Sequence, residues 1–257
     1  MVKIDHLQTK VHLLCLVGPG GCGKETKGKI LRNILFEHMP VARFVMSELI
    51  EELKKRHSQS EHITRTMQRG GLVDDSCVIR TFAESVIEAQ SSGSPLIIAD
   101  GFPRTVAQSQ WLLDCRVPFH ILHIDIDEEE SVKRIRERSK TQQRCDDDVV
   151  RDRYQTYSQE TVPAIRHIKH VNPKIVTSID GKLFVREQIV RMLRPVHALP
   201  RFKRIPLQSS IRIIDSSSHP AAQSIRAIDG ATKPLTVPSE MVISGRHGDT
   251  KRVPLLS

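Results

Sequence analysis

The feature that most constrains this chain is a glycine-rich turn that leads directly into a lysine. The turn reads Gly18-Pro19-Gly20-Gly21-Cys22-Gly23-Lys24; the apolar run Val11 to Val17 precedes it, and apolar residues at helical spacing follow over 24–38. Glycines let backbone N–H groups converge on phosphate oxygens, the helix amino terminus adds positive potential, and the lysine reaches the outer phosphates. Strand, turn and helix together predict a phosphate-binding loop; a flexible turn without a ligand is the alternative.

The residue after Lys24 departs from the usual motif. Glu25 stands where Ser or Thr is common, and Thr26 follows it, so we expect the Thr26 hydroxyl near the metal of a bound nucleotide. A carboxylate in the first turn of a helix is favourable, and Lys29 four residues on can hold Glu25 along the helix surface. We therefore expect Glu25 to be tolerated.

A second motif, Asp100-Gly101-Phe102-Pro103-Arg104, comes directly after an expected buried strand at Leu96–Ala99. Ligands of open α/β sheets bind at the carboxyl ends of the strands. There a carboxylate can orient the water shell of Mg²⁺, and an arginine can hold a phosphate with two hydrogen bonds. Alone, the pentapeptide could be only a turn. Combined with the phosphate-binding loop, it predicts a site for a nucleotide.

Apolar runs and helical spacing alternate along the first 194 residues. Strands are expected at 11–17, 42–46, 96–99, 119–126 and 174–178, and helices at 24–38, 47–56, 76–91, 127–138, 149–170 and 184–193, with a short helical piece ending at Gly70. This alternation is typical of an α/β protein with helices on both faces of a mostly parallel sheet. We expect a three-layer α/β/α core.

The composition excludes several other classes. Leu13 to Val17, the longest clean apolar stretch near the start, is far shorter than the ~20 residues that span a bilayer, and no secretory signal is visible. The five cysteines form no C-x-x-C pair, which suits free thiols in a reducing cytosol. The net charge is +9, but residues 1–199 carry only part of it, so we expect no nucleic-acid binding by the core.

The chain changes character after Arg194. Prolines and serines interrupt every possible element over 195–257, which predicts a largely disordered tail. From residue 200 the tail carries nine Lys or Arg against four Asp or Glu, a charge that would attract an acidic partner. One internal similarity, 210–215 with 224–229, marks a docking segment or arises by chance. Removal of 200–257 is expected to leave activity and unfolding unchanged.

Further motifs follow the first two in order. They are Gln108, the run Arg-Ile-Arg-Glu-Arg at 134–138, Arg144 with Asp146 and Asp147, Arg153, and Ile179-Asp180-Gly181. With the phosphate-binding loop, they resemble the adenylate kinase family of nucleoside monophosphate kinases over about residues 11–194. The resemblance implies a kinase domain at 1–194, with a small helical insertion at about 44–76 closing over the monophosphate and a short lid at about 138–152 closing over ATP.

The resemblance also implies which residues contact ATP. Transfer of a γ-phosphoryl group to another phosphate needs positioning and cancellation of charge, because the acceptor oxygen is already anionic. The implied catalytic residues are Lys24, Arg104, Arg138, Arg144 and Arg153. The implied ATP contacts are Gly18, Gly20, Gly21, Cys22, Gly23, Lys24, Glu25, Thr26, Arg134, Arg138 and Gly181, with Mg²⁺ held near Thr26 and, through water, Asp100. Asp146 and Asp147 either hold the lid arginines or cap the next helix.

The implied AMP contacts are Met46, Ser47, Glu51, Val73, Gly101, Arg104, Gln108, Arg144 and Arg153. Gln108 matches the place where adenine-specific members read the base, and a carboxamide can donate and accept at once; a surface glutamine at a helix start is the alternative. Two residues depart from the family. Met46, with Ser47 beside it, replaces a usual threonine, and Glu51 replaces an arginine that grips the monophosphate.

The sequence therefore predicts an ATP:AMP phosphotransferase that uses Mg²⁺ with ATP and is cytoplasmic and monomeric. Two alternatives remain open. Met46 and Glu51 favour a related kinase for another nucleoside monophosphate or small acceptor. The basic tail favours a nucleotide-binding scaffold with weak or no activity.

Overall fold

The computed structural model describes residues 11–56, 60–115, 117–140, 149–199, 207–216, 218–229, 240–244 and 250–254. Within these ranges, five parallel strands form one sheet in the order β2-β3-β1-β4-β5. The strands are β1 (His12–Val17), β2 (Val41–Val45), β3 (Leu96–Asp100), β4 (Phe119–Asp125) and β5 (Val176–Asp180). The predicted α/β fold with a central parallel sheet is confirmed.

The central strand β1 is buried on both of its faces. Leu13, Cys15 and Val17 belong to one apolar cluster, whereas Leu14 and Leu16 belong to a second cluster on the opposite face. A continuous apolar run is what a parallel strand with helices on both sides requires, since alternate side chains point to opposite faces. The core therefore has two halves, one on each side of the sheet.

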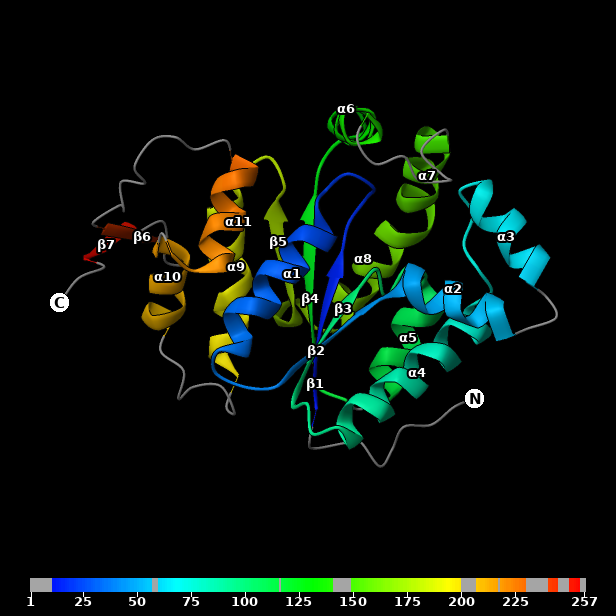
Figure 1. Ribbon diagram of the computed structural model, residues 1–257, viewed down its shortest axis with the longest axis horizontal. Coiled ribbons are helices and arrows are strands. Elements are labelled where there is room, and N and C mark those ends of the chain that lie inside the picture. Colours follow the sequence, from blue (N-terminus) through cyan, green and yellow to red (C-terminus); the bar gives the residue numbers. More distant parts are fainter. Residues whose placement is uncertain are drawn as a thin grey trace.

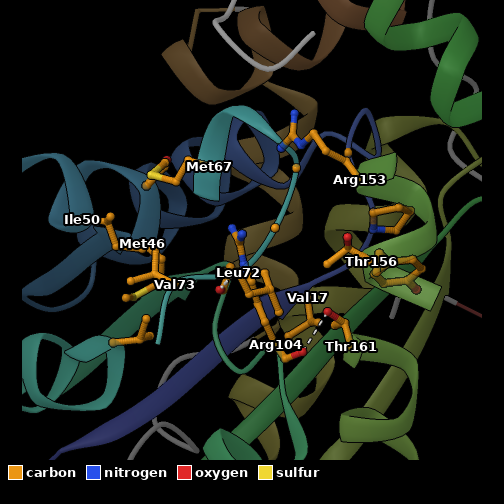
Figure 2. Close-up of a pocket in the computed structure, with 18 of the residues that line it drawn as sticks. Val17, Met46, Ile50, Met67, Leu72, Val73, Arg104, Arg153, Thr156 and Thr161 are labelled. Atoms are coloured by element: carbon orange, nitrogen blue, oxygen red, sulfur yellow. Dashed lines mark hydrogen bonds between the residues drawn. The ribbon is translucent and has the colours of Figure 1, made fainter. Parts of the chain in front are cut away.

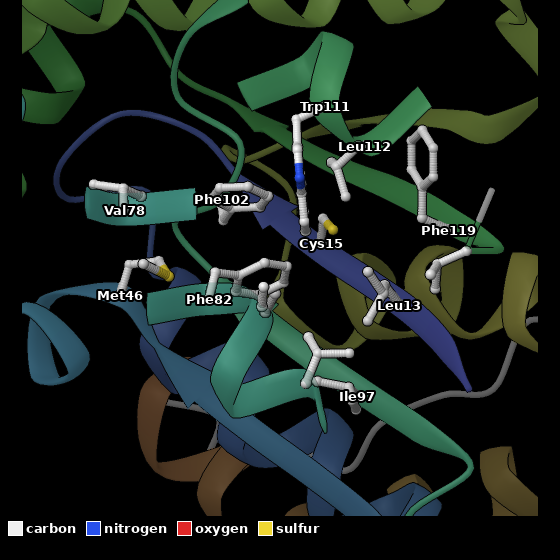
Figure 3. Packing of buried hydrophobic residues seen from close by; sticks show 14 of the residues in the cluster. Leu13, Cys15, Met46, Val78, Phe82, Ile97, Phe102, Trp111, Leu112 and Phe119 are labelled. Atoms are coloured by element: carbon white, nitrogen blue, oxygen red, sulfur yellow. The ribbon is translucent and has the colours of Figure 1, made fainter. Parts of the chain in front are cut away.

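Helices α1 (Lys24–Phe36) and α9 (Val185–Ala198) cover one face, and α4 (Asp75–Ser91), α5 (Val106–Asp114) and α8 (Val162–Val171) cover the other (Figure 1). On the second face, Phe82 stacks on Phe102 with ring centroids 4.2 Å apart, and Trp111 meets both rings edge-on (Figure 3). Burial of three such rings contributes a large share of the apolar area on this face.

The remaining helices of the expected core are α2 (Met46–Arg56), α3 (Ser60–Gln68), α6 (Glu128–Ser139) and α7 (Val150–Thr156). The single helix expected at 149–170 contains a π-helical turn, Tyr157–Thr161, between α7 and α8. A short 3₁₀ turn at Pro173–Ile175 precedes the last strand, which therefore begins at Val176 and not at residue 174 as expected. Asn172 caps this turn by accepting a hydrogen bond from the Lys174 N–H at 3.1 Å.

Helix α5 was not among the expected helices. The Thr105 hydroxyl oxygen caps it by accepting a hydrogen bond from the backbone N–H of Gln108 at 3.2 Å. Thr followed three residues later by Gln is a known signal for the start of a helix. That signal could have predicted α5 from the sequence.

The prediction of a largely disordered tail does not hold for two of its segments, 207–215 and 220–229, which are helical. Helices α10 (Leu207–Asp215) and α11 (Pro220–Asp229) pack against α1 and α9 on their outer side (Figure 1). The two helices contain the similar segments 210–215 and 224–229, whose apolar residues recur at helical spacing. Pro220 lies at the first helical position, where a proline costs no hydrogen bond.

Specific contacts hold the two added helices on the core. Ile214 and Ile225 are each 1% exposed and join the cluster formed by α1 and α9. The guanidinium of Arg186 on α9 pairs with the Asp215 carboxylate at 2.9 Å, and Arg226 donates to the Asp215 carbonyl oxygen at 3.1 Å. This arrangement makes α10 and α11 part of the folded unit.

Two further strands, β6 (Glu240–Ser244) and β7 (Thr250–Pro254), form an antiparallel pair of their own. Among the described helices, none combines the length and apolar character needed to cross a membrane.

The packing of α10 and α11 predicts a stability difference between two truncated variants. Ending the chain after residue 206 exposes apolar residues of α1 and α9, so the melting temperature should fall. Ending it after residue 229 keeps both helices and should leave the melting temperature unchanged. The substitution Ile225→Ala should cost about 2–5 kcal/mol of unfolding free energy, because it opens a cavity in the core. Equal melting temperatures for both truncations would contradict this assignment.

Candidate functional site

One pocket at the carboxyl ends of β1 and β3 gathers residues from distant parts of the chain. Ten of the residues predicted for the nucleotide site line it, namely Gly18, Gly20, Lys24, Met46, Ser47, Val73, Gly101, Arg104, Gln108 and Arg153. The pocket therefore joins the phosphate-binding loop to the Asp-Gly-Phe-Pro-Arg turn, as the two motifs predicted.

Strand pairing brings these two loops together. β1 and β3 are neighbours in register, with Leu16 opposite Asp100, and the Gly101 N–H donates to the Leu16 carbonyl oxygen at 2.9 Å. β4 pairs with the other edge of β1, so the order in which strands are added to the sheet changes direction at β1. In an open parallel sheet, ligands usually bind at such a switch point.

The phosphate-binding loop has a backbone that only glycine adopts easily. Gly21 and Gly23 have φ angles of 72° and 80°, and a Cβ atom on Gly18 would lie 2.2 Å from the Ile124 carbonyl oxygen. The Lys24 ammonium donates to the carbonyl oxygens of Gly18 and Pro19 at 2.7 and 2.8 Å. The lysine is thus held over its own loop, at the mouth of the pocket.

Arg104 and Gln108 are fixed by a network of hydrogen bonds. The Arg104 Nε–H donates to the Gly101 carbonyl oxygen at 2.9 Å, and the Gln108 Oε1 accepts from the Arg104 backbone N–H at 2.7 Å. The Gln108 Nε2 donates to Asp75 at 2.7 Å, as does the Thr105 hydroxyl at 2.9 Å. Gln108 is only 2% exposed, so the alternative of a surface glutamine is wrong.

Asp75 is a member of this network that sequence reasoning missed. Its carboxylate oxygen accepts the hydrogen bond from the Gln108 Nε2 and so orients the carboxamide. Asp75 follows Asp74, whose side chain caps α4 by accepting from the backbone N–H groups of Ser76 and Cys77. Neither acid is among the residues that the sequence singled out, and nothing in the sequence linked Asp75 to Gln108.

Apolar and polar side chains lie on different sides of the pocket (Figure 2). Met46, Ile50, Met67 and Val73 come from α2, α3 and the loop before α4, whereas Arg153, Thr156 and Thr161 come from α7 and the π-helical turn. Arg104 lies between these groups, with its carbonyl oxygen accepting from the Thr161 hydroxyl at 3.0 Å. The pocket can therefore hold a molecule with one apolar surface and one anionic group.

Glu51 is not among the pocket residues. Its carboxylate is half exposed and pairs with the Lys54 ammonium at 2.8 Å on the surface of α2. Glu51 therefore forms an ion pair with a lysine of its own helix, at the surface of that helix. Ser47, one turn earlier, does line the pocket.

The other predicted ATP contacts surround the loop outside the pocket. Glu25 pairs with Lys29 at 2.8 Å, which confirms the contact expected between them. Thr26 is exposed, and Arg134 pairs with Glu130 at 2.6 Å on α6, the helix that also carries Arg138. Gly21, Cys22 and Gly23 complete the turn, and the Gly181 N–H donates to the Asp125 carbonyl oxygen at 2.8 Å. Arg144, Asp146 and Asp147 lie outside the described residues.

Asp100, the residue expected near the metal, is buried and pairs with Arg43 on β2 at 3.2 Å. A carboxylate and a hydroxyl are the oxygen donors that Mg²⁺ prefers, so Asp100 and Thr26 fit a metal that arrives with nucleotide phosphates. No three His, Cys, Asp or Glu residues in the described ranges cluster as a metal site would require.

A buried polar chain borders the pocket at the π-helical turn. The Tyr157 hydroxyl and the His123 Nε2 are 2.7 Å apart, and both residues are less than a tenth exposed. Burial, and then the charge of Asp125, which also accepts a hydrogen bond from the phenol, raise the pKa of Tyr157. Burial lowers the pKa of His123. The buried imidazole is therefore neutral and hydrogen-bonded to the phenol, which in turn bonds to the exposed carboxylate of Asp125.

Comparison with known proteins agrees with this geometry. The model of the adenylate kinase family, described as "Adenylate kinase", matches residues 16–172. The adenylate kinase of Maricaulis maris is 33% identical over 165 residues, which cover 59% of this chain and 82% of that protein. The adenylate kinase of Flavobacterium psychrophilum is 29% identical over 72% of this chain and 98% of its own length. Adenylate kinase isoenzyme 1 of Caenorhabditis elegans is 28% identical over 67% and 82%.

The polar chain at the π-helical turn predicts the effect of removing one hydroxyl. Tyr157→Phe leaves the buried Nε2 of His123 without its hydrogen-bond partner, so the free energy of unfolding should be about 1–3 kcal/mol lower than in the wild type. Tyr154→Phe is a matched control, because its hydroxyl donates only to the Ile126 carbonyl oxygen at 3.2 Å and is partly exposed. Urea denaturation of both variants measures the difference. An equal or smaller loss for Tyr157→Phe would show that the chain contributes nothing.

Proposed function

The chain belongs to the adenylate kinase family, and on this premise we propose that it transfers the γ-phosphoryl group of ATP to AMP, giving two ADP. The observation that carries the proposal is the single pocket that holds both Lys24 of the phosphate-binding loop and Arg104 of the Asp-Gly-Phe-Pro-Arg turn. A donor phosphate at the first and an acceptor phosphate at the second would lie in one site. Family membership supports a nucleoside monophosphate kinase, and AMP is the acceptor that we propose.

On the donor side, the phosphates of ATP would bind at the amino terminus of α1. The proposed contacts are Gly18, Gly20, Gly21, Cys22, Gly23, Lys24, Glu25, Thr26, Arg134, Arg138 and Gly181. The Lys24 ammonium donates to the carbonyl oxygens of two loop residues, Gly18 and Pro19. We propose that the anionic phosphate oxygens replace these carbonyls as acceptors, since a charged acceptor makes a stronger hydrogen bond.

On the acceptor side, AMP would bind between α2 and the turn after β3. The proposed contacts are Met46, Ser47, Val73, Gly101, Arg104, Gln108, Arg144 and Arg153, whereas Glu51 lies on the same helix as Met46 but outside the pocket. Met46, which is 1% exposed, and Val73 offer an apolar wall for the base. The guanidinium groups of Arg104 and Arg153 supply positive charge on the other side, where the monophosphate would bind.

The chemistry that we propose depends on charge and position. The attacking oxygen of AMP is already anionic, so the protein needs no strong general base. Lys24, Arg104, Arg138, Arg144 and Arg153 would offset the negative charge that meets during transfer. Mg²⁺ bound with ATP would supply further neutralisation of the phosphates, with Asp100 and Thr26 as the residues near it. We propose that 44–76 and 138–152 close over the two nucleotides and exclude water.

Measurement of ADP release tests the proposal. Purified protein is given ATP and Mg²⁺ with AMP, CMP, UMP or GMP as acceptor, and ADP is followed by a coupled assay. We expect AMP to be the best acceptor. Preference for another acceptor would favour the related kinase that Met46 and Glu51 suggest, and nucleotide binding without turnover would favour the scaffold.

The substitution Lys24→Ala tests the phosphate-binding loop. Loss of the ammonium should lower turnover by about 100-fold or more, because it removes a positive charge at the transferred group. Lys29→Ala, also on α1 but pointing to solvent, should turn over normally. Unfolding midpoints of both variants should match the wild type. Near-normal turnover by Lys24→Ala would refute the loop assignment.

The substitution Glu51→Arg tests the placement of AMP. A guanidinium at this position should lower the KM for AMP by about tenfold, the equivalent of one charge-assisted hydrogen bond of about 1.5 kcal/mol. The KM for ATP should change little. Glu61→Arg on α3 is the control, since Glu61 is likewise exposed and paired within its own helix. An unchanged or higher KM for AMP in Glu51→Arg would place the acceptor elsewhere.

A further inference from the structure

A buried arginine holds the carboxylate expected near the metal. The Arg43 Nη2 on β2 lies 3.2 Å from the Asp100 Oδ2, and the two side chains are only 10% and 6% exposed. Arg43 was not among the residues that the sequence singled out. Its partner becomes evident only from strand order, which places β2 beside β3 with Val45 opposite Asp100.

The space around Arg43 is shaped for its guanidinium. A Cβ atom on Gly28 of α1 would lie 2.9 Å from the Arg43 Nε, so the glycine leaves room for the side chain. The Nη2 also donates to the Glu25 carbonyl oxygen, at 3.4 Å. The Nε is buried and has no hydrogen-bond partner among the described residues. A glycine inside a helix costs about 1 kcal/mol relative to alanine, and here it accommodates a fixed cation.

The guanidinium of Arg43 contacts the carboxylate whose negative charge would attract Mg²⁺. Asp100 ends β3 directly before Gly101, which lines the nucleotide pocket. A carboxylate attracts a hydrated Mg²⁺ by its charge, and a guanidinium in contact with that carboxylate offsets the charge. Burial keeps water from screening the pair, so the offset extends to ions on the open side of Asp100.

A second cation lies close by. Lys27 of α1 is 4% exposed, and its ammonium donates to the Cys22 carbonyl oxygen at 2.7 Å, beneath the phosphate-binding loop. Arg43 and Lys27 thus approach the loop from the interior of the protein. Because the Arg43–Asp100 pair is neutral overall, Lys27 supplies the positive charge that attracts anionic phosphates without a metal ion.

We propose that Arg43 is a positioning residue that fixes Asp100 and offsets its charge, so that ATP binding by this chain depends only weakly on Mg²⁺. The inference rests on the proposed function in so far as the phosphate-binding loop takes ATP. It concerns the coupling between Mg²⁺ and ATP, which is the ratio of the dissociation constants of ATP without and with saturating Mg²⁺.

Calorimetric titration of ATP at increasing Mg²⁺ measures this coupling without turnover. Arg43→Gln releases the charge of Asp100, so the coupling should rise by about fivefold or more. Arg43→Lys keeps the charge and should resemble the wild type. Arg166→Gln, an exposed arginine on α8, is the matched control and should change nothing.

The double variant Arg43→Gln with Asp100→Asn decides the question even where Arg43→Gln alone fails to fold, because it leaves no unpaired buried charge. If Arg43 offsets Asp100, removal of both charges should leave the coupling within about twofold of the wild type. A fall of about fivefold or more would mean that Asp100 serves the metal despite Arg43, and would overturn the inference. An unchanged coupling in a folded Arg43→Gln would overturn it as well.

The same titration separates this inference from the proposed function. Absence of ATP binding by the wild type at every Mg²⁺ concentration would overturn both. If the wild type and all variants bind ATP with the same strong dependence on Mg²⁺, only the role assigned to Arg43 is overturned.

Discussion

The site depends on how closely the turn after β1 approaches the end of β4. A Cβ atom on Gly18 would collide with the Ile124 carbonyl oxygen, and one on Gly20 would lie 2.9 Å from the Ile135 side chain of α6. Only glycine allows this approach at position 18, and Gly21 and Gly23 take the left-handed backbone that turns the chain into α1. The turn fixes where the backbone N–H groups and Lys24 point, and so where a phosphate can bind.

Strand order then supplies the other half of the site. Because β1 lies between β3 and β4, the loops after all three strands meet at one edge of the sheet. The loop after β3 brings Arg104 beside the phosphate-binding loop, and the π-helical turn brings Tyr157 and Thr161 from the opposite side. π-helical turns are often found at functional sites, since they shift the register of side chains by one residue. Here that shift coincides with the residues that face the pocket.

Much of this arrangement could be predicted from the sequence because its signals are local. The glycine turn, the Asp-Gly-Phe-Pro-Arg motif and the alternation of strands and helices each occupy a short segment, and the structure places them together. The pairs Arg43 with Asp100 and Asp75 with Gln108 could not be predicted, because each joins residues from separate elements. The sequence does not predict α10 and α11 for another reason: prolines and serines usually interrupt helices, whereas Pro220 begins one.

Helix α1 links the added helices to the nucleotide site. Its amino terminus follows the glycine turn and carries Lys24, Gly28 in its middle leaves room for Arg43, and Glu37 at its carboxyl end lies 3.4 Å from His219. The family match ends at residue 172, so α10 and α11 lie beyond the part of the chain that it covers. They add apolar contacts to α1 and α9 on the side away from the pocket. Their contribution is therefore to the stability of the helix that carries Lys24.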